Sequence, residues 1–286
     1  MVVEIDKKSG FCFGVVKAIE ATDEVLERGE KIYSLGQIVH NKEEITRLED
    51  KGMVTINHDE FSTMERKTIL FRAHGESPKS YITAKQSGHK VIDATCPVVL
   101  KLQQRVKNAC ERLSKINGQL VIFGKAGHAE VIGLLGQTEG KGILIEGEED
   151  LYKLDYSRPV ETFSQTTMNV DKIKNMISII KDRIDSPSLF KTNNTTCRQV
   201  SDRFAHLRSF SKKYDVIVFV GGKNSSNSKM LYHECKRNNE NSYFVSNPDE
   251  LDKKWFADSV ERVGICGGTS TPFWLMDNVA KAIPEL

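Results

Sequence analysis

Three cysteines each stand where a strand-like segment runs into a helical one, and this repeated junction constrains the fold most strongly. Residues 90–93 read as a strand that leads to Cys96. Pro97 suits the first position of a helix, because the amide hydrogen that it lacks would have no partner there. Cys12 and Cys197 stand at junctions of the same kind. The start of a helix favours a thiolate. The helix after Cys96 is predicted from apolar residues at helical spacing: Val99, Leu102, Val106, Ala109 and Leu113.

The order of elements after each of these cysteines is also the same. A helix is followed by a strand, a polar loop, a second helical segment, a short strand, an acidic connector and a last strand that ends in another polar loop. Strands that alternate with helices predict parallel sheets. We therefore predict an α/β protein of three pseudo-repeated lobes with small, mainly parallel sheets. The predicted lobes are residues 1–96, 97–195 and 196–286.

The six polar loops carry imidazole, hydroxyl and amide groups. Parallel sheets bind ligands at the carboxyl ends of their strands, so the loops and the three cysteines are predicted to share one central cavity if the lobes face one another. Such hydrogen-bonding groups suit a phosphate or diphosphate better than an apolar ligand. The candidate residues are His40, His74, His128, Thr166, Ser225, Ser226, Asn227 and Ser270.

Two chemical questions stay open at the level of residue spacing. Three thiolates with a histidine could hold zinc, whereas three thiolates alone could hold a cubane iron–sulfur cluster with one iron free to bind a substrate oxygen. A carboxylate in the site is a candidate proton donor. Glu130 stands two residues after His128 and Glu76 two residues after His74, so spacing does not choose between them.

The other cysteines and histidines are predicted to be structural or solvated. Cys110 and Cys235 fall in predicted helices and Cys266 in a predicted strand, and buried cysteines behave as small apolar residues. The remaining four histidines are expected to be solvated: His58, His89, His206 and His233.

Composition excludes several classes of protein. The net charge of +2 and the lack of a long basic run disfavour nucleic acid as a partner. No run of 18 apolar residues indicates a membrane span, and the charged N-terminal residues do not resemble a secretory signal. We therefore predict a cytoplasmic protein with free thiols. Without a Cys-x-x-Cys pair, the usual zinc-ribbon and thioredoxin-like interpretations do not apply.

Seven motifs, in order along essentially the whole chain, resemble those of the 4-hydroxy-3-methylbut-2-enyl diphosphate reductase family, which catalyses the last step of the non-mevalonate isoprenoid pathway. Several such motifs together are highly specific, although any one alone would not be. They are Phe11-Cys12-Phe13-Gly14-Val15, Val39-His40-Asn41-Lys42, Ala73-His74-Gly75, Asp93-Ala94-Thr95-Cys96-Pro97, Gly127-His128-Ala129-Glu130, Gln165-Thr166-Thr167 and Lys223-Asn224-Ser225-Ser226-Asn227-Ser228.

The resemblance implies three lobes around a central [4Fe–4S] cluster held by Cys12, Cys96 and Cys197. It implies that Glu130, and not Glu76, serves the proton transfers. The implied reaction is a two-electron reductive dehydroxylation that gives isopentenyl and dimethylallyl diphosphates, with a ferredoxin or flavodoxin as electron donor. The implied catalytic residues are Glu130, Thr166 and His128, and the diphosphate would be held by His40, His74, His128, Ser225, Ser226, Asn227 and Ser270, with Thr166 close to the reacting end.

The sequence departs from the family pattern at a few positions. Ala129 stands where the family usually has proline, between two functional residues that are retained. Val200 and Phe204 replace a threonine and a glutamine that often follow the third cysteine, while Arg203 matches. Phe273 stands where an acidic residue is common. The departures leave the cluster ligands intact and put supporting contacts from positions 200 and 204 in question.

Two functions of other classes compete with the reductase. One is a zinc-stabilised protein that binds a diphosphate without redox chemistry. The other is a hydrolase with a cysteine nucleophile paired with a histidine. Stoichiometric zinc would favour the first, and inactivation of metal-free protein by alkylation would favour the second.

Overall fold

The computed structural model describes residues 1–285 and divides into two compact units, Met1–Thr55 with Arg198–Leu286, and Ile56–Cys197. Within residues 1–285 the strands form three four-stranded sheets, and the α/β class predicted from the sequence is confirmed. One sheet has the order β1-β12-β10-β11, another the order β7-β6-β8-β9, and the third consists of β3, β2, β4 and β5.

The first unit contains the sheet β1-β12-β10-β11 and five α-helices of the described chain. Its strands are β1 (Val2–Ile5), β2 (Tyr33–Leu35), β10 (Val216–Val220), β11 (Ser242–Val245) and β12 (Arg262–Gly267), and β3 (Val54–Ile56) lies at its boundary. Its helices are α1 (Phe13–Glu27), α2 (Lys42–Asp50), α8 (Arg198–Ser211), α9 (Ser226–Asn238) and α10 (Phe273–Ala282), with 3₁₀ turns η3 (Pro248–Glu250), η4 (Lys253–Trp255) and η5 (Ile283–Glu285).

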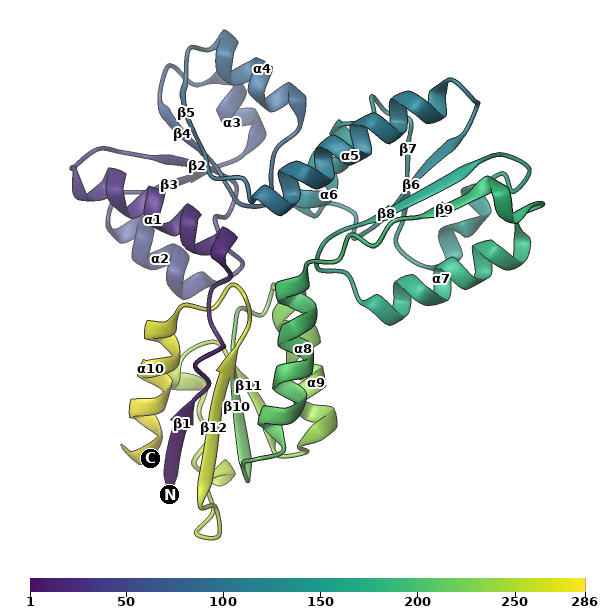
Figure 1. Cartoon of the computed structure of the whole chain (residues 1–286). Coiled ribbons are helices and arrows are strands. Elements are labelled where there is room, and N and C mark those ends of the chain that lie inside the picture. The colour runs from purple at the N-terminus through teal and green to yellow at the C-terminus, as the bar shows by residue number, and fades with distance from the viewer. Residues whose placement is uncertain (286) are drawn as a thin grey trace. The chain divides into compact units, whose positions relative to one another are not determined.

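This sheet is covered on both faces because its central strand is apolar on both faces. In β10, Val216, Val218 and Val220 pack with residues of α10, whereas Ile217 and Phe219 pack with residues of α8 and α9. Alternate strand residues point to opposite faces, so the uninterrupted apolar run places α10 on one side and α8 and α9 on the other (Figure 1).

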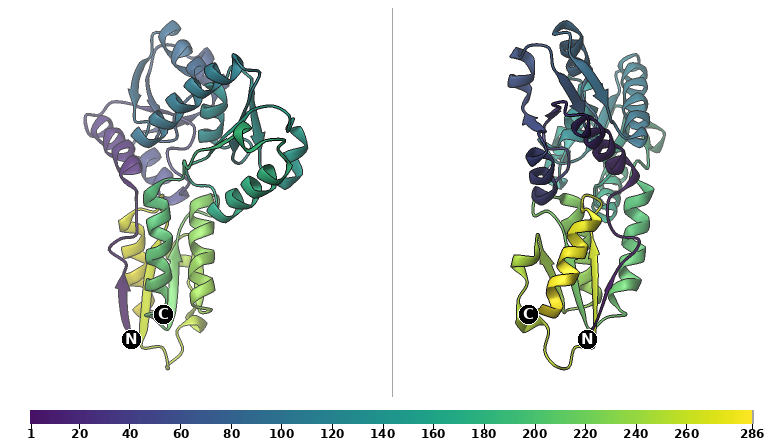
Figure 2. Two further views of the ribbon diagram at one scale, coloured as in Figure 1. Left: turned by 45° about the vertical axis from the view of Figure 1, so that its right-hand side comes forward. Right: turned by 90° about the vertical axis from the view of Figure 1, so that its left-hand side faces the viewer.

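The N-terminal strand joins a sheet built mainly from the C-terminal third of the chain. β1 pairs in parallel with β12, with Val3 opposite Val263 and Ile5 opposite Ile265 (Figure 2). The predicted first lobe, residues 1–96, includes this strand. The lobe boundaries at 96/97 and 195/196 stay a prediction, but the pairing of β1 shows that the strand before Cys12 depends on β12 for its partners.

The second unit contains the sheet β7-β6-β8-β9 and the parallel pair β4–β5. Its strands are β4 (Thr68–Phe71), β5 (Lys90–Asp93), β6 (Gln119–Phe123), β7 (Gly142–Ile145), β8 (Val160–Ser164) and β9 (Phe190–Thr192). Its helices are α3 (His58–Thr63), α4 (Pro78–Gln86), α5 (Pro97–Ser114), α6 (Ala129–Gly136) and α7 (Val170–Arg183), with 3₁₀ turns η1 (Glu148–Lys153) and η2 (Pro187–Leu189).

The central strand β6 again buries both of its faces. Leu120 and Ile122 pack with the apolar face of α5, and Val121 and Phe123 pack with α7. The face of α5 predicted from the sequence is the buried one: Val99, Leu102, Val106, Ala109 and Leu113. The acidic connectors are helical turns, and in α3 Asn57 and Glu60 form a capping box.

The prediction that the three cysteines outside the candidate site are buried is confirmed, whereas the prediction of a solvated side chain is wrong for two of the four other histidines. Cys110, Cys235 and Cys266 are buried in apolar clusters. His89 is not solvated, because it is buried and stacks on Phe61 with ring centroids 5.3 Å apart. His206 is half-buried and its Nε2 lies 2.8 Å from a carboxylate oxygen of Asp6.

In the described residues 1–285, no helix combines the length and apolarity needed to cross a membrane.

Candidate active site

The three predicted metal ligands are half-buried cysteines, outside any disulfide, at the starts of helices. Cys12 is the N-cap of α1, with an extended backbone, Cys96 is the N-cap of α5, and Cys197 directly precedes α8. The amide groups at the start of a helix favour a negative charge on a nearby sulfur. The local arrangement predicted for these cysteines is therefore confirmed.

Each of these cysteines is also bonded to a loop that follows a strand. The amide of Cys12 donates to the carbonyl of Thr269 (3.1 Å), that of Cys96 to Ala73 (3.1 Å) and that of Cys197 to Thr166 (2.8 Å). The acceptor loops follow β12, β4 and β8. They carry three of the predicted substrate-binding residues: Ser270, His74 and Thr166. The repeated junction of the sequence thus has a repeated backbone hydrogen bond in the structure, a signal that sequence spacing did not reveal.

In the second unit, Glu130 and Thr166 form a buried pair. One carboxylate oxygen of Glu130 accepts from the Thr166 amide (2.7 Å) and the other from the Thr166 hydroxyl (2.8 Å). Glu130 is 2% exposed. Burial raises its pKa to about 7, although the two hydrogen bonds from Thr166 act to lower it. A carboxyl group with a pKa near neutrality can both donate and accept a proton.

Glu76, the alternative that sequence spacing left open, has different neighbours. It is also 2% exposed, and burial raises its pKa while the charge of Arg72 opposes that shift. One carboxylate oxygen of Glu76 lies 3.8 Å from the Arg72 guanidinium and the other accepts a hydrogen bond from the Ser80 hydroxyl (3.1 Å). These contacts tie the chain after β4 to the first turn of α4, which suits a structural role.

Two histidines of the second unit lie beside the Glu130–Thr166 pair. His128 is the N-cap of α6, and its Nδ1 accepts from the amide of Glu130 (3.2 Å). Because Nδ1 accepts, the ring proton of the neutral imidazole is on Nε2, which can then donate to an anion. The ring of His74 meets that of His128 edge-on, with centroids 5.6 Å apart. The second unit therefore brings His74, His128, Glu130 and Thr166 together.

In the first unit, predicted anion-binding residues cluster at the start of α9. Ser225 is the N-cap of this helix, and its hydroxyl accepts from the Ser270 hydroxyl (3.2 Å). The side-chain carbonyl of Asn227 accepts from the amide and the hydroxyl of Thr269. The Nδ2 of Asn227 is buried and has no hydrogen-bond partner in residues 1–285. An unsatisfied buried donor at the start of a helix fits a phosphate oxygen.

His40 is held against this region by backbone packing and by α2. It directly precedes Asn41, the N-cap of α2, and in the first turn Glu44 accepts from the Trp274 indole (2.8 Å). Gly222, in the loop after β10, packs on the carbonyl of His40. Sequence reasoning missed this contact, although the Gly221–Gly222 pair could have indicated a close approach of two backbones.

Arg203 is a second residue whose role sequence reasoning missed. Its guanidinium donates to the carbonyl groups of Gly10 and Gly267 (both 3.3 Å), so it connects the segment before Cys12 to the end of β12. Burial lowers the pKa of Arg203, while the charges of Asp6 and Cys12 oppose the shift. Of the two residues of α8 that depart from the family pattern, Val200 is buried and Phe204 packs against the apolar cluster that contains Leu207 and Phe210.

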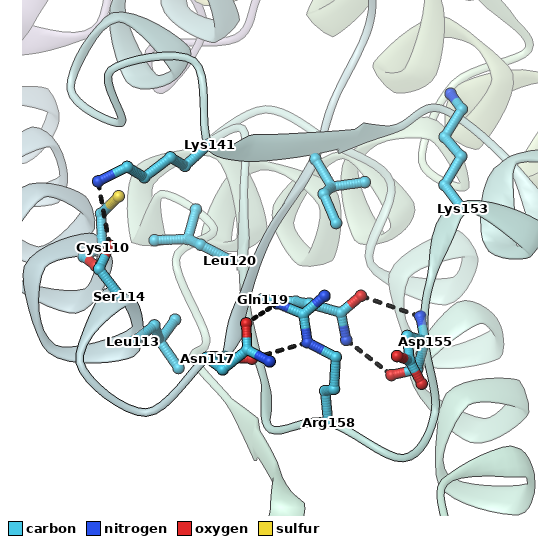
Figure 3. A pocket seen from close by; sticks show the side chains of 12 residues that line it. Cys110, Leu113, Ser114, Asn117, Gln119, Leu120, Lys141, Lys153, Asp155 and Arg158 are labelled. Atoms are coloured by element: carbon cyan, nitrogen blue, oxygen red, sulfur yellow. Dashed lines mark hydrogen bonds between the residues drawn. The ribbon is translucent and has the colours of Figure 1, made fainter.

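A cavity of about 470 Å³ in the second unit lies beside the start of β6, at the amino end of that strand and away from the polar loops at the carboxyl ends of the sheet β7-β6-β8-β9 (Figure 3). It is lined by Cys110 and by residues around the start of β6, where the side chain of Gln119 bonds the backbone of Asp155 and Arg158 bonds Asn117. Ligands of parallel sheets bind at the carboxyl ends of the strands. We assign this cavity no function.

The comparisons with known proteins agree with this picture. The family model described as LytB protein matches residues 3–284. The chain belongs to the LytB family. Proteins named 4-hydroxy-3-methylbut-2-enyl diphosphate reductase from Bacteroides fragilis and Parabacteroides distasonis are 47% and 48% identical to this LytB protein. The alignments cover 98% and 99% of this chain and 97% and 98% of those proteins.

Solved structures of the same family resemble this LytB protein over its length. The structure of (E)-4-hydroxy-3-methyl-but-2-enyl diphosphate reductase, described as the terminal enzyme of the non-mevalonate pathway, matches with a TM-score of 0.74 and 34% identity over all of both chains. The Plasmodium falciparum reductase matches with a TM-score of 0.83 and 26% identity, over 98% of this chain and 87% of that one. The predictions of the family and of a reductase are confirmed.

The contact between Gly222 and His40 predicts a costly glycine substitution. In Gly222→Ala, the new Cβ would lie 1.9 Å from the His40 carbonyl oxygen, and backbone atoms cannot rotate away. We expect a loss of about 2 kcal/mol in the free energy of unfolding, measured by urea denaturation. In the control Gly221→Ala, the new Cβ would lie 2.9 Å from the Ser228 hydroxyl, 3.0 Å from the Ser228 Cβ and 3.2 Å from the Phe219 ring, and we expect a smaller loss because these contacts are longer. An equal loss in both variants would contradict this explanation.

The buried carboxyl of Glu130 predicts a pH-dependent stability. Its pKa is raised in the folded state, so between about pH 4.5 and 7 the folded chain binds more protons than the unfolded chain and stability falls as pH rises. In Glu130→Gln this contribution is absent. Urea denaturation at pH 5 and pH 8 should show that the wild type loses about 3 kcal/mol relative to Glu130→Gln across this range. Parallel pH profiles would show that Glu130 titrates normally.

Proposed function

We propose that this LytB protein reductively removes the hydroxyl group of 4-hydroxy-3-methylbut-2-enyl diphosphate to give isopentenyl and dimethylallyl diphosphates. The observation that carries the proposal is the buried Glu130–Thr166 pair, whose Thr166 carbonyl accepts the amide of Cys197. A proton donor with a pKa of about 7 is thereby connected to one of the proposed metal ligands. The names of the relatives support the substrate.

The proposed cofactor is a [4Fe–4S] cluster held by Cys12, Cys96 and Cys197. All three are half-buried and outside any disulfide, and thiolates are the usual ligands of such clusters. The backbone bonds that fix each cysteine to a loop would keep the thiols oriented in the absence of metal. When bound, the cluster would supply the two electrons and an iron without a thiolate ligand that can polarise the hydroxyl oxygen.

The proposed diphosphate site uses the start of α9 and the histidine loops. Ser225, Ser226 and Asn227 present hydroxyl and amide donors beside the free amide groups of a helix start, and Ser270 is hydrogen-bonded to Ser225. His40, His74 and His128 would add imidazole donors. Fixing the diphosphate orients the hydroxyl end of the substrate, which lowers the entropic cost of the reaction.

The proposed proton path runs from Glu130 through the Thr166 hydroxyl. Removing the hydroxyl group consumes two electrons and two protons: the carbon–oxygen bond breaks, water leaves and a new carbon–hydrogen bond forms. Protonated Glu130 can give its proton to the Thr166 oxygen, 2.8 Å away, while Thr166 passes its own proton to the departing hydroxyl. His128 is bonded to the Glu130 amide and would hold the diphosphate nearby.

The proposed electron donor is a ferredoxin or flavodoxin, because the reaction needs external electrons. We also propose a cytoplasmic location, which agrees with six cysteines that form no disulfide in the described chain.

The test is anaerobic turnover with a small reductant. Protein purified without oxygen should be brown, contain iron and sulfide, and convert the hydroxylated diphosphate to the two products with dithionite-reduced methyl viologen. No turnover by reconstituted, brown protein would contradict the reaction. Colourless protein with stoichiometric zinc would instead favour a diphosphate-binding protein, and alkylation that inactivates metal-free protein would favour the hydrolase.

A further inference from the structure

The surface on either side of Cys12 combines exposed aromatic and basic groups in one hollow. Phe13, at the first position of α1, is 44% exposed. It borders a cavity of about 360 Å³ that lies entirely within the first unit. We call this cavity the Phe13 hollow. It is lined by Lys8, Phe11, Phe13, Gln199, Asp202, Arg203 and His206.

The charges around the Phe13 hollow are mainly positive. Lys7 and Lys8 are exposed, and the Arg203 guanidinium lies at its wall. The acidic Asp202 at its rim lies 3.5 Å from Arg198, which is itself almost fully exposed. The carboxylate of Asp6 is buried and bonded to His206 and Ser9, so it adds little negative charge to the surface. A basic patch attracts an acidic partner and speeds its association.

A lone exposed phenylalanine is common on protein surfaces. This one adjoins a proposed cluster ligand in the chain, and its amide donates to Gln199 across the hollow (3.4 Å), which fixes the start of α1. Interfaces favour aromatic residues and arginine at the centre. Electron-transfer complexes bury small areas, so docking of a carrier protein does not require a large apolar surface around the hollow.

We propose that the Phe13 hollow and its basic rim are the docking surface for an acidic one-electron carrier protein that supplies the reductase. The proposal rests on the proposed function. Two reduced carriers would each be oxidised by one electron for every substrate whose carbon–oxygen bond is broken. The hydroxyl leaves as water after taking up a proton, and a second proton completes the new carbon–hydrogen bond.

The test separates docking from chemistry by changing the donor. Lys8→Glu reverses a charge at the hollow, and the side chain of Lys8 is not part of the proposed catalytic or substrate-binding set. The matched control Lys172→Glu makes the same charge change on α7, at a first-turn position where glutamate is favoured behind the N-cap Asn169. Turnover is measured with an acidic [2Fe–2S] ferredoxin and, separately, with reduced methyl viologen.

We expect Lys8→Glu to raise the KM for ferredoxin by about fivefold and to reduce the dependence of that KM on salt. Turnover with methyl viologen should stay unchanged in both variants, and Lys172→Glu should behave as the wild type with both donors. A ferredoxin KM in Lys8→Glu equal to that of Lys172→Glu would overturn the docking surface. Loss of methyl viologen turnover in the wild type would count against the proposed function instead.

Discussion

Replacing Glu130 by glutamine is expected to lower kcat with methyl viologen by about a thousandfold. Glutamine can keep the hydrogen bond from the Thr166 amide, but it cannot give a proton to the Thr166 hydroxyl. In the wild type, kcat should fall as pH rises through about 7, because the deprotonated carboxylate cannot act as an acid. The measurement is a steady-state pH profile under anaerobic conditions.

Glu76→Gln is the matched control for this experiment. Glu76 is as deeply buried as Glu130, yet its carboxylate contacts Arg72 and Ser80. We expect it to change thermal stability and to leave kcat within a few-fold of the wild type. If Glu76→Gln lowered kcat as much as Glu130→Gln, the assignment of the proton donor would be wrong.

Replacing Cys197 by serine is expected to remove the visible absorption of the purified protein and to lower turnover more than about a hundredfold. Serine preserves the size of the side chain and the amide bond to Thr166, but its hydroxyl is a much poorer ligand for iron than a thiolate. Iron content and the absorption spectrum measure the effect directly. Cys12→Ser and Cys96→Ser should behave alike, because each stands at the same kind of junction.

Cys110→Ser provides the control for a lost thiol. Cys110 is buried on α5, and its thiol donates to the carbonyl of Thr138 (3.5 Å), a bond that a serine hydroxyl can replace. This variant should keep its iron and its turnover and lose only a little stability. Full iron content in Cys197→Ser, or loss of iron in Cys110→Ser, would contradict the proposed ligand set.

The positions of the strands and helices followed from local patterns in the chain. The apolar run 216–220 and the helical spacing after Cys96 are short-range signals, and both predicted elements are present. The six polar loops follow strands because the chain must turn where each apolar run ends. The side chains that these loops carry were therefore predictable as a group, before any contact between them was known.

Local patterns in the chain were enough to predict the α/β class, the helix-start position of Cys12, Cys96 and Cys197, and the polar character of the loops. The contacts between distant residues could be known only from the folded chain. The fold placed β1 beside β12 and paired Glu130 with Thr166, 36 positions away along the chain. The spacing of apolar residues predicts which face of a helix or strand is buried. It does not predict which distant element packs on that face, because this depends on packing and desolvation in the folded chain. For this reason spacing did not distinguish Glu76 from Glu130, whereas their partners in the structure do: Thr166 for Glu130, and Arg72 and Ser80 for Glu76.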